Sequence, residues 1–356
     1  LDYRCGIVSN ALQMNDGDDV FFIGPVNDEF DSEDFTVSLY FKASDLINTQ
    51  YLLSKRWEDC RSENVFNVRY SPTANSLNAF VAESPNKAIS LTASLNPDRC
   101  WYHVVVWRQG PEVRLYIDGE LIDSRRTTSR IELTNPGNLM LGSSDCKSPN
   151  ERNFSGLIDE FRVYNRALRG FEIDELYLAP DQIETPNALI FEGESVDIEL
   201  SSTCASSFQW FPITGVDNPS SPNPTITPLS PGLSFYTVQF RDTITSCVAL
   251  DSIEINVIDP DDLDCNNIFL PNAFTPNNDG LNDEFGISNP FAIPQLISFE
   301  IYNRSGERLF VTDDPFATWD GNYDGQEINS SVLKYVIRYV CKGEELFITG
   351  STNLMR

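Results

Sequence analysis

The chain has 356 residues, of which 41% are hydrophobic, and its formal net charge is -28 at pH 7. This length and apolar content allow two or three globular domains, and no stretch is long and apolar enough to cross a membrane. The acidic excess opposes binding to nucleic acid or to an anionic membrane surface, while it keeps a secreted protein in solution and offers carboxylates for calcium.

The cysteines fall into three groups along the chain. Four lie in the first 150 residues, two follow near the middle and two lie in the last hundred: Cys5, Cys60, Cys100, Cys146, Cys204, Cys247, Cys265 and Cys341. An even number in each segment predicts disulfides that close within domains, and disulfides indicate an oxidising compartment. No Cys or His cluster has the spacing of a zinc site.

Residues 1–180 read as short strands separated by Gly, Pro, Asn and Asp. Residues 35–41 alternate, residues 101–107 form a long β-rich run, and residues 113–122 form a hairpin around Asp118 and Gly119. Helical periodicity is almost absent. The segment is therefore predicted to be an antiparallel β-sandwich.

The order of these pieces resembles the laminin G-like, concanavalin-like jelly roll. The matching residues are 10–20, 35–41, 101–104, 116–119, 139–142 and 156–168. The resemblance implies a short surface helix at 172–177, a glycan or protein ligand and often a calcium ion. Relatives that are glycosidases carry a Glu-x-Asp-x-x-Glu strand. Here Glu172 and Asp174 are followed by Tyr177 instead of Glu, so we expect a binding domain and not an enzyme.

Calcium is the cofactor that we expect in this domain. Asp16, Asp18 and Asp19 crowd around Gly17, and the resemblance brings Asp159 back beside the first strands. Clustered oxygen ligands on turns suit Ca²⁺. The alternative is ordinary turn chemistry with solvated acids, and the residues alone leave both open.

The histidine and the tryptophans suggest packing more than chemistry. His103 is the only histidine, and we expect it to be a hydrogen-bonded strand residue without a triad. Trp57, Trp101 and Trp107 could form a sugar-stacking platform. Trp101 and Trp107 are an even number of residues apart, so they face the same side of one strand, and we favour core packing for them.

A second domain is predicted at 184–258. A polar connection ends near Pro186, and a new alternating pattern begins at residue 194. The order Cys204, Trp210, Cys247 is similar to that of immunoglobulin-like sandwiches, in which a disulfide packs against the indole. The segment resembles PKD-like and Ig-like spacer repeats and carries no evident chemistry.

The last domain is predicted at 263–356, with strands at 296–303, 308–311, 332–340 and 346–351. Two prolines and a run of Asn, Asp and Gly make residues 271–283 a tightly turned loop. The segment resembles the type B sorting domain, or gliding-motility-associated C-terminal domain, of type 9 secretion system cargo. The residues that carry this sorting motif are Pro271, Asn272, Phe274, Thr275, Pro276, Asn278, Asp279, Gly280, Asn282, Asp283, Trp319, Asp320 and Gly321.

This resemblance implies export by the type 9 translocon of a Bacteroidota bacterium and retention on the cell surface by a PorP-like outer-membrane barrel. A second, weaker calcium candidate is the group Asp279, Asn282 and Asp283. For the disulfides we expect Cys204 with Cys247 and Cys265 with Cys341. Among the four N-terminal cysteines we expect Cys60 with Cys100 and Cys5 with Cys146, and leave other pairings within that domain open.

The whole chain is thus predicted to be all-β, with three consecutive sandwiches at 1–180, 184–258 and 263–356. We expect a non-enzymatic, surface-displayed protein with an adhesive glycan- or protein-binding head, acting in adhesion or gliding motility. The alternative is the end of a larger secreted polysaccharide-degrading enzyme in which the first domain is a carbohydrate-binding module. Since the other features indicate export, we expect a signal peptide before Leu1.

Overall fold

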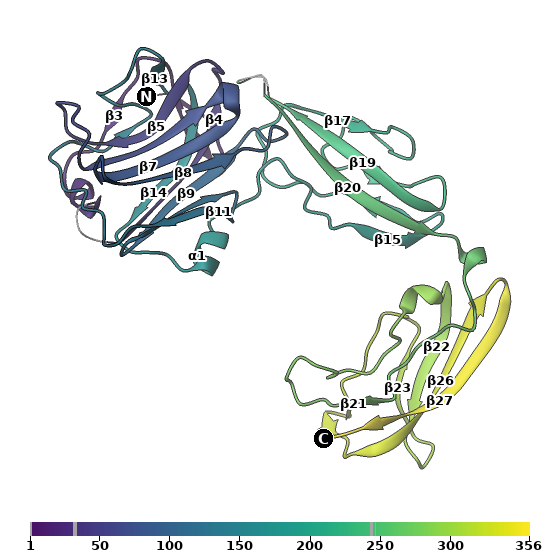
Figure 1. Cartoon of the computed structure of the whole chain (residues 1–356). Helices are drawn as coiled ribbons and strands as arrows, with labels where there is room; N and C mark the ends of the chain where they lie inside the picture. Colours follow the sequence, from purple (N-terminus) through teal and green to yellow (C-terminus); the bar gives the residue numbers. More distant parts are fainter. Residues whose placement is uncertain (1, 31–33, 243–244, 246) are drawn as a thin grey trace. The chain divides into compact units, whose positions relative to one another are not determined.

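The computed structural model describes residues 2–30, 34–242, 245 and 247–356, and its regular secondary structure is almost all strand (Figure 1). The prediction of an all-β chain is confirmed. The chain divides into two compact units. The first contains residues 1–187, 196–226 and 235–254, and the second contains residues 188–195, 227–234 and 255–356.

Two antiparallel sheets form the jelly roll of the first unit. The strands of the first sheet, in spatial order, are β1 (Asp2–Cys5), β2 (Asn10–Met14), β14 (Gly156–Tyr164), β4 (Phe35–Ala43), β9 (Tyr102–Gln109), β10 (Glu112–Ile117) and β11 (Glu120–Arg126). Those of the second sheet are β3 (Val20–Phe21), β12 (Met140–Leu141), β5 (Thr49–Lys55), β6 (Val65–Ser71), β7 (Ser76–Ser84) and β8 (Lys87–Ser94). A short strand, β13 (Glu151–Asn153), pairs in parallel with β5. Two 3-10 helices lie at Pro25–Phe30 and Pro72–Ala74.

The main hydrophobic core lies between these two sheets. Leu39 and Phe41 of β4 contribute from the first sheet, and Phe66 and Val68 of β6 contribute from the second. Because side chains alternate along a strand, Asn67 and Arg69 of β6 lie on the opposite face of the second sheet. We call this the outer face.

The first sheet is buried on its other side as well. Val105 and Trp107 of β9 pack there against Leu168 and Ile173. Leu168 precedes the helix α1 (Gly170–Asp174), and Ile173 lies in it. This second layer explains why residues 101–107 show no regular alternation of polar and apolar side chains. The predicted helix is present but begins two residues earlier than expected, and Glu172 caps it by accepting a hydrogen bond from the backbone N–H of Arg169 (2.8 Å).

The segment after the jelly roll forms a four-stranded sheet and a strand pair. The sheet has the order β15 (Ala188–Phe191), β20 (Val248–Ile258), β19 (Gly232–Arg241) and β17 (Ser207–Phe211), and β16 (Val196–Asp197) pairs with β18 (Thr225–Ile226). Trp210 is fully buried, and its Nε1 donates to the carbonyl oxygen of Ser221 (2.9 Å).

The disulfides differ from the predicted pairing. Of the predicted bonds, Cys265–Cys341 is confirmed, whereas Cys204–Cys247, Cys60–Cys100 and Cys5–Cys146 are wrong; the structure contains Cys5–Cys204, Cys60–Cys146 and Cys100–Cys247. Even numbers of cysteines in each segment are equally compatible with bonds between segments. Two bonds therefore join the jelly roll to the following segment.

Polar contacts at this junction show why the cysteines meet across it. Within the first unit the buried Lys42 ammonium lies 2.6 Å from the Asp242 carboxylate. The backbone N–H of Leu250 donates to the carbonyl oxygen of Asp98 (2.9 Å). Asp98 precedes Cys100 closely in the chain, and Asp242 and Leu250 flank Cys247, so docking of the two segments brings these sulfurs together.

The second unit contains a five-stranded sheet with one packed face. The strands, in spatial order, are β21 (Ala273–Phe274), β27 (Glu344–Leu354), β26 (Ser331–Cys341), β22 (Gln295–Tyr302) and β23 (Arg308–Thr312). A further pair joins β24 (Asn322–Tyr323) to β25 (Gln326–Glu327), and 3-10 helices lie at Pro260–Asp262 and Pro290–Ala292. The core of this sheet includes Phe274, Phe299, Trp319 and Ile337. The four strands predicted in this segment are all present.

Candidate functional site

A cavity of 360 Å³ opens on the outer face of the second sheet. Its lining includes Tyr51, Arg56, Asn67, Arg69 and Phe80. Strand register explains the grouping, because Tyr51 of β5 pairs with Arg69 of β6 and Asn67 of β6 pairs with Phe80 of β7. Cross-strand partners share a face of the sheet, so three strands contribute to one wall. We call this the outer-face cavity.

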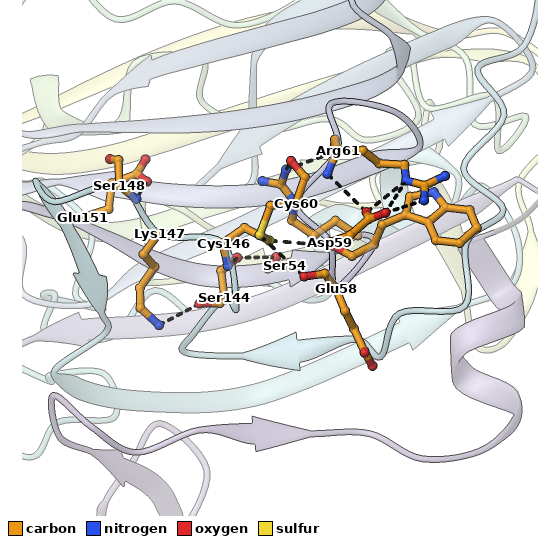
Figure 2. The surroundings of a disulfide bond; sticks show 12 residues. Ser54, Glu58, Asp59, Cys60, Arg61, Ser144, Cys146, Lys147, Ser148 and Glu151 are labelled. Carbon is orange, nitrogen blue, oxygen red and sulfur yellow. Dashed lines mark hydrogen bonds and ion pairs between the residues drawn. A yellow bond between two sulfur atoms is a disulfide. The ribbon is translucent and has the colours of Figure 1, made fainter.

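One rim of the cavity is a loop fixed by the Cys60–Cys146 disulfide, whose surroundings Figure 2 shows. The Arg56 guanidinium donates through Nη2 to the carbonyl oxygens of Cys60 and Arg61, each at 3.0 Å. The Arg61 guanidinium lies 4.1 Å from the ring centroid of Trp57 and pairs with Asp59, with Nε 2.9 Å from Oδ1. These contacts order the rim before any ligand arrives.

Glu151 organises the opposite end of the cavity. Its carboxylate accepts hydrogen bonds from Arg69 Nη1 (2.9 Å), from the Tyr51 hydroxyl (3.2 Å) and from the backbone N–H of Ser148 (2.9 Å). Burial acts to raise the pKa of Glu151, but the bonds from Ser148 and Arg69 outweigh it, and the pKa lies below its ordinary value. Glu151 is thus held as an anion that neutralises Arg69.

Several buried polar atoms at the cavity have no hydrogen-bond partner among the residues that the structure describes. They are Arg56 Nε, Asn67 Oδ1 and Arg69 Nε, and Trp57 Nε1 on the adjoining loop is a fourth. Asn67 is only 4% exposed. A buried polar group without a partner costs about 1 to 3 kcal/mol, so such groups call for a water or a ligand. Donors, an acceptor and the rings of Tyr51 and Phe80 together suit a polyhydroxylated ligand.

The sequence pattern did not reveal this cavity. Asn67 and Arg69 stand out only as polar members of an alternating strand, a pattern common to most half-buried strands. Their partners Tyr51, Phe80 and Glu151 come from other strands, and pairing register was needed to place them. Of the predicted sugar-stacking tryptophans, Trp57 lies on the rim loop, whereas Trp101 and Trp107 are buried in separate clusters.

His103 is a packed residue, although it has a partner that the sequence did not reveal. Its Nε2 lies 2.8 Å from the Ser38 hydroxyl, and its ring stacks on Tyr40 with centroids 4.5 Å apart. Burial, and secondarily the charge of Arg162, lowers the pKa of His103 to about 3. Because Ser38 and His103 are both buried, this pair is inaccessible to a substrate.

A carboxyl group with a raised pKa lies in another cavity of the first unit. Burial raises the pKa of Asp118 to about 6, and its Oδ1 accepts a hydrogen bond from the backbone N–H of His103 (2.8 Å). Asp118 lines a 370 Å³ cavity together with Asn96, Arg99 and Tyr177. The hydrogen bond to the backbone of β9 explains why a carboxyl group is accommodated at this position.

The predicted calcium ligands of the first domain do not come together. Ile158 of β14 pairs with Leu12 of β2, so Asp159 lies five strand positions, roughly 16 Å, from Asp16. The Asp159 carboxylate instead accepts from the backbone N–H groups of Ile7 (2.7 Å), Val8 (3.2 Å) and Glu160 (2.8 Å). This geometry corrects the expectation of one ion held by Asp159 and the Asp16 loop.

The Asp16 loop itself bounds a 270 Å³ cavity that Asp18 and Asp19 line. Asp18 Oδ2 accepts from the backbone N–H (2.8 Å) and side-chain Nδ2 (3.0 Å) of Asn15, and Asp16 Oδ2 lies 3.9 Å from an Arg152 nitrogen. In the described part of the chain no three His, Cys, Asp or Glu side chains are grouped so that they could hold a metal. Calcium at this loop therefore stays a prediction.

The sorting-motif loop is tied together by Asp283. Its Oδ1 accepts from the backbone N–H groups of Asn277 (2.8 Å) and Asn278 (2.7 Å), and its Oδ2 from that of Gly280 (2.8 Å). Asp279 Oδ1 accepts from Leu281 N–H (2.8 Å), and the carbonyl oxygen of Asn282 accepts from Thr275 N–H (2.7 Å). Asp279, Asn282 and Asp283 thus all take part in hydrogen bonds within the loop, and calcium at this group stays a prediction.

Other members of the motif hold this loop to the sheet. The Phe274 and Trp319 rings pack 5.9 Å apart, and Trp319 Nε1 donates to the carbonyl oxygen of Asn322 (2.8 Å). The carbonyl oxygen of Asn272 accepts from the backbone N–H of Asn353 in β27 (3.0 Å). A Cβ on Gly321, whose φ is +79°, would come within 3.0 Å of the Leu354 side chain. The remaining motif residues lie outside the strands: Pro271, Pro276 and Asp320.

The comparison with family models finds two matches, one in the jelly roll and one in the last segment. Residues 15–174 match the family model of the concanavalin A-like lectin/glucanases superfamily, and residues 268–352 match that of the CHU_C type IX secretion signal domain. The second match implies export through the type IX secretion system. A search among curated proteins finds no match. In the described residues no helix is long and apolar enough to cross a membrane.

Three solved structures illustrate the similarity of fold. The CBM40 of an IT-sialidase from Ruminococcus gnavus is 17% identical, with 47% of this chain and 96% of that chain covered and a TM-score of 0.42. Domain 4 of AbnA, a GH43 extracellular arabinanase from Geobacillus stearothermophilus, is 18% identical, with coverages of 49% and 80% and a TM-score of 0.35. The SAP-like pentraxin from Limulus polyphemus is 15% identical, with coverages of 41% and 70% and a TM-score of 0.34.

Proposed function

We propose that this chain is a glycan-binding protein that the type IX secretion system of a Bacteroidota bacterium exports and displays on the cell surface. The outer-face cavity carries the binding role. Its rings and its buried, unpartnered donors and acceptor match the alternation of apolar faces and hydroxyl groups on a sugar. The superfamily match of residues 15–174 supports the same role.

The proposal treats the head as a binding module without catalysis. His103 and Asp118, the two titratable groups with the largest pKa shifts described above, owe those shifts mainly to burial, and the backbone hydrogen bond that Asp118 accepts acts to lower its pKa. The cavity lining contains no carboxylate that could act as an acid or a nucleophile. If the chain is part of a polysaccharide-degrading enzyme, the same cavity would serve as its carbohydrate-binding module.

The anchoring part of the proposal concerns residues 263–356. We propose that this domain is read by the translocon and then held by a PorP-like outer-membrane barrel, so that the head acts in adhesion or gliding. The match of residues 268–352 to a secretion signal domain supports this assignment. The rigid loop at 277–283 favours recognition, because an ordered surface loses little entropy on binding.

Binding is tested with the full chain on an array of neutral and acidic glycans. We expect at least one class of glycan to bind, and we expect Asn67→Ala to weaken that binding roughly tenfold, because the buried acceptor is lost. Asn223→Ala, at an exposed position of the middle segment, is the matched control. A chain that is folded yet binds no glycan would refute the binding role.

Export is tested with residues 263–356 fused to a periplasmic reporter in a host that has the type IX system. We expect the reporter to become accessible to protease at the cell surface. The double variant Asp279→Ala, Asn282→Ala is then scored separately for export and for thermal stability. If export survives while stability falls, the loop is structural and the signal lies elsewhere in the domain.

A further inference from the structure

The electrostatics of the outer-face cavity differ from those of the whole chain. The chain contains 53 acidic and 25 basic residues. The cavity lining nevertheless includes two arginines, Arg56 and Arg69, and no carboxylate. A local excess of positive charge in so acidic a protein indicates that the cavity favours an anionic ligand.

The two arginines are not equivalent. Glu151 lies 2.9 Å from Arg69 and compensates its charge. The hydrogen bonds of Arg56 go to the carbonyl oxygens of Cys60 and Arg61, which carry no net charge. Both guanidinium groups act on the Tyr51 hydroxyl, whose pKa is raised by burial and by Glu151 and lowered by Arg69 and Arg56. The uncompensated positive charge in the cavity is therefore that of Arg56.

The polar atoms lie in a row along β6. Lys55 pairs with Phe66, which places Arg56 beside Val65 at the start of the strand. Asn67 and Arg69 follow on the same face at steps of roughly 7 Å. The row thus consists of the charged donor Arg56, the buried acceptor Asn67 and the donor Arg69, whose charge Glu151 neutralises. Arg56 Nε, Asn67 Oδ1 and Arg69 Nε each lack a hydrogen-bond partner among the described residues.

We propose that the outer-face cavity selects sugars that carry a carboxylate. The carboxylate binds at Arg56 Nε, and ring hydroxyls bind Asn67 Oδ1 and Arg69 Nε. Charge-assisted hydrogen bonds are roughly twice as strong as neutral ones, and guanidinium suits carboxylate geometry. This inference rests on the proposed glycan binding and names the ligand class for the same cavity.

The test compares matched pairs of probes by isothermal titration of the full chain. One pair is an oligogalacturonate and its carboxyl-reduced form, and the other is sialyllactose and lactose. We expect the acidic member of at least one pair to bind roughly tenfold or more tightly than its neutral partner. The pair that shows the preference identifies whether the carboxylate comes from a uronic acid or from a sialic acid.

Variants assign the preference to Arg56. Arg56→Gln should reduce the affinity for the acidic probe more than it reduces the affinity for the neutral one, so that the roughly tenfold preference is lost. Arg56→Lys keeps the positive charge and should keep part of the preference, which distinguishes loss of charge from a structural change of the loop. The Cys60–Cys146 bond holds that loop in both variants. Arg125→Gln, at a 63% exposed side chain of the first sheet, is the control.

The outcomes separate this inference from the proposed function. Equal affinities for the acidic and neutral members of both pairs, with glycan binding intact, would overturn the inference alone. So would a preference that Arg56→Gln leaves unchanged. If the folded chain binds no glycan on the array, the proposed function fails and the inference falls with it.

Discussion

Asp118 shows how one residue can be tolerated at a cost. It occupies the left-handed region (φ 51°) in the turn between β10 and β11, where Asp and Asn are both accepted. Its carboxylate accepts a hydrogen bond from the His103 backbone, yet burial raises its pKa to about 6. Burial therefore disfavours the charged form that dominates at neutral pH.

We expect Asp118→Asn to stabilise the protein at pH 8 and to have little effect at pH 4. The folded pKa lies above the unfolded value, so the carboxyl group opposes folding progressively as pH rises from about 4 to about 6, and its full unfavourable contribution is present above the folded pKa. A shift of this size corresponds to about 2 to 3 kcal/mol at most. The measurement is the free energy of unfolding in urea at both pH values. A loss of stability at pH 8 would show that the ionised carboxylate is needed.

Asp283 shows the opposite behaviour at a half-buried position. Desolvation acts to raise its pKa, but the backbone N–H groups of Gly280, Asn277 and Asn278 outweigh this, and the pKa is lowered. A depressed pKa means that the loop gains stability above the unfolded pKa of the carboxyl group and loses it as pH falls through the folded pKa.

Asp283→Asn should therefore increase hydrogen exchange at residues 277–280, because an amide has one acceptor oxygen where the carboxylate uses both. The protection of these amides in the wild type should also fall in acid. Asp313→Asn, at an exposed position, is the control. Unchanged exchange in the Asp283 variant would mean that the prolines alone hold the loop.

At the scale of elements, the four disulfides give a direct test of how the segments are joined. Non-reducing peptide mapping should recover Cys5–Cys204, Cys60–Cys146, Cys100–Cys247 and Cys265–Cys341. Replacing Cys100 and Cys247 together by Ala should cost roughly 2 to 4 kcal/mol of unfolding free energy, since the bond restricts the unfolded chain. Recovery of a Cys204–Cys247 peptide would restore the pairing expected from the sequence.

The Asp16 loop is one of the two places where calcium is predicted. If an ion binds there, it must compete with Asn15 for Asp18 Oδ2. Calcium in excess should then raise the melting temperature relative to EGTA, because a ligand of the folded state stabilises it by mass action. Asp18→Asn should abolish the difference, with Asp28→Asn as the control. Identical melting curves in calcium and EGTA would leave this loop as turn chemistry.

The elements that the sequence predicted best are those fixed by local pattern. The hairpin around Asp118 and the four strands of the last segment follow from alternation and turn residues, and the structure contains them. Features that depend on pairing were missed or wrong. The outer-face cavity needs the register of β5, β6 and β7, and the bond of Cys100 to Cys247 needs the docking of two segments. Local periodicity contains neither kind of information.

At the scale of the molecule, the same limit applies to domain organisation. The ranges 1–180, 184–258 and 263–356 remain predictions, and the family matches at 15–174 and 268–352 fall inside the first and the last. The middle segment is the part where pattern failed, because the Cys, Trp, Cys order predicted an internal disulfide. Each of those two cysteines pairs with the jelly roll instead.

The Cys100–Cys247 bond also determines how the first unit would respond to mechanical load. The cavity residues precede Cys100 in the chain. A force applied between a ligand bound in the cavity and the residues after Cys247 is therefore transmitted through the Cys100–Cys247 disulfide and not through the residues between these two cysteines. The 147-residue separation that the bond closes is then shielded from extension. Stretched out, that length would release on the order of 500 Å of chain. With the bond intact the protein would resist a pull as a short, stiff tether, whereas reduction would turn it into a long, compliant one.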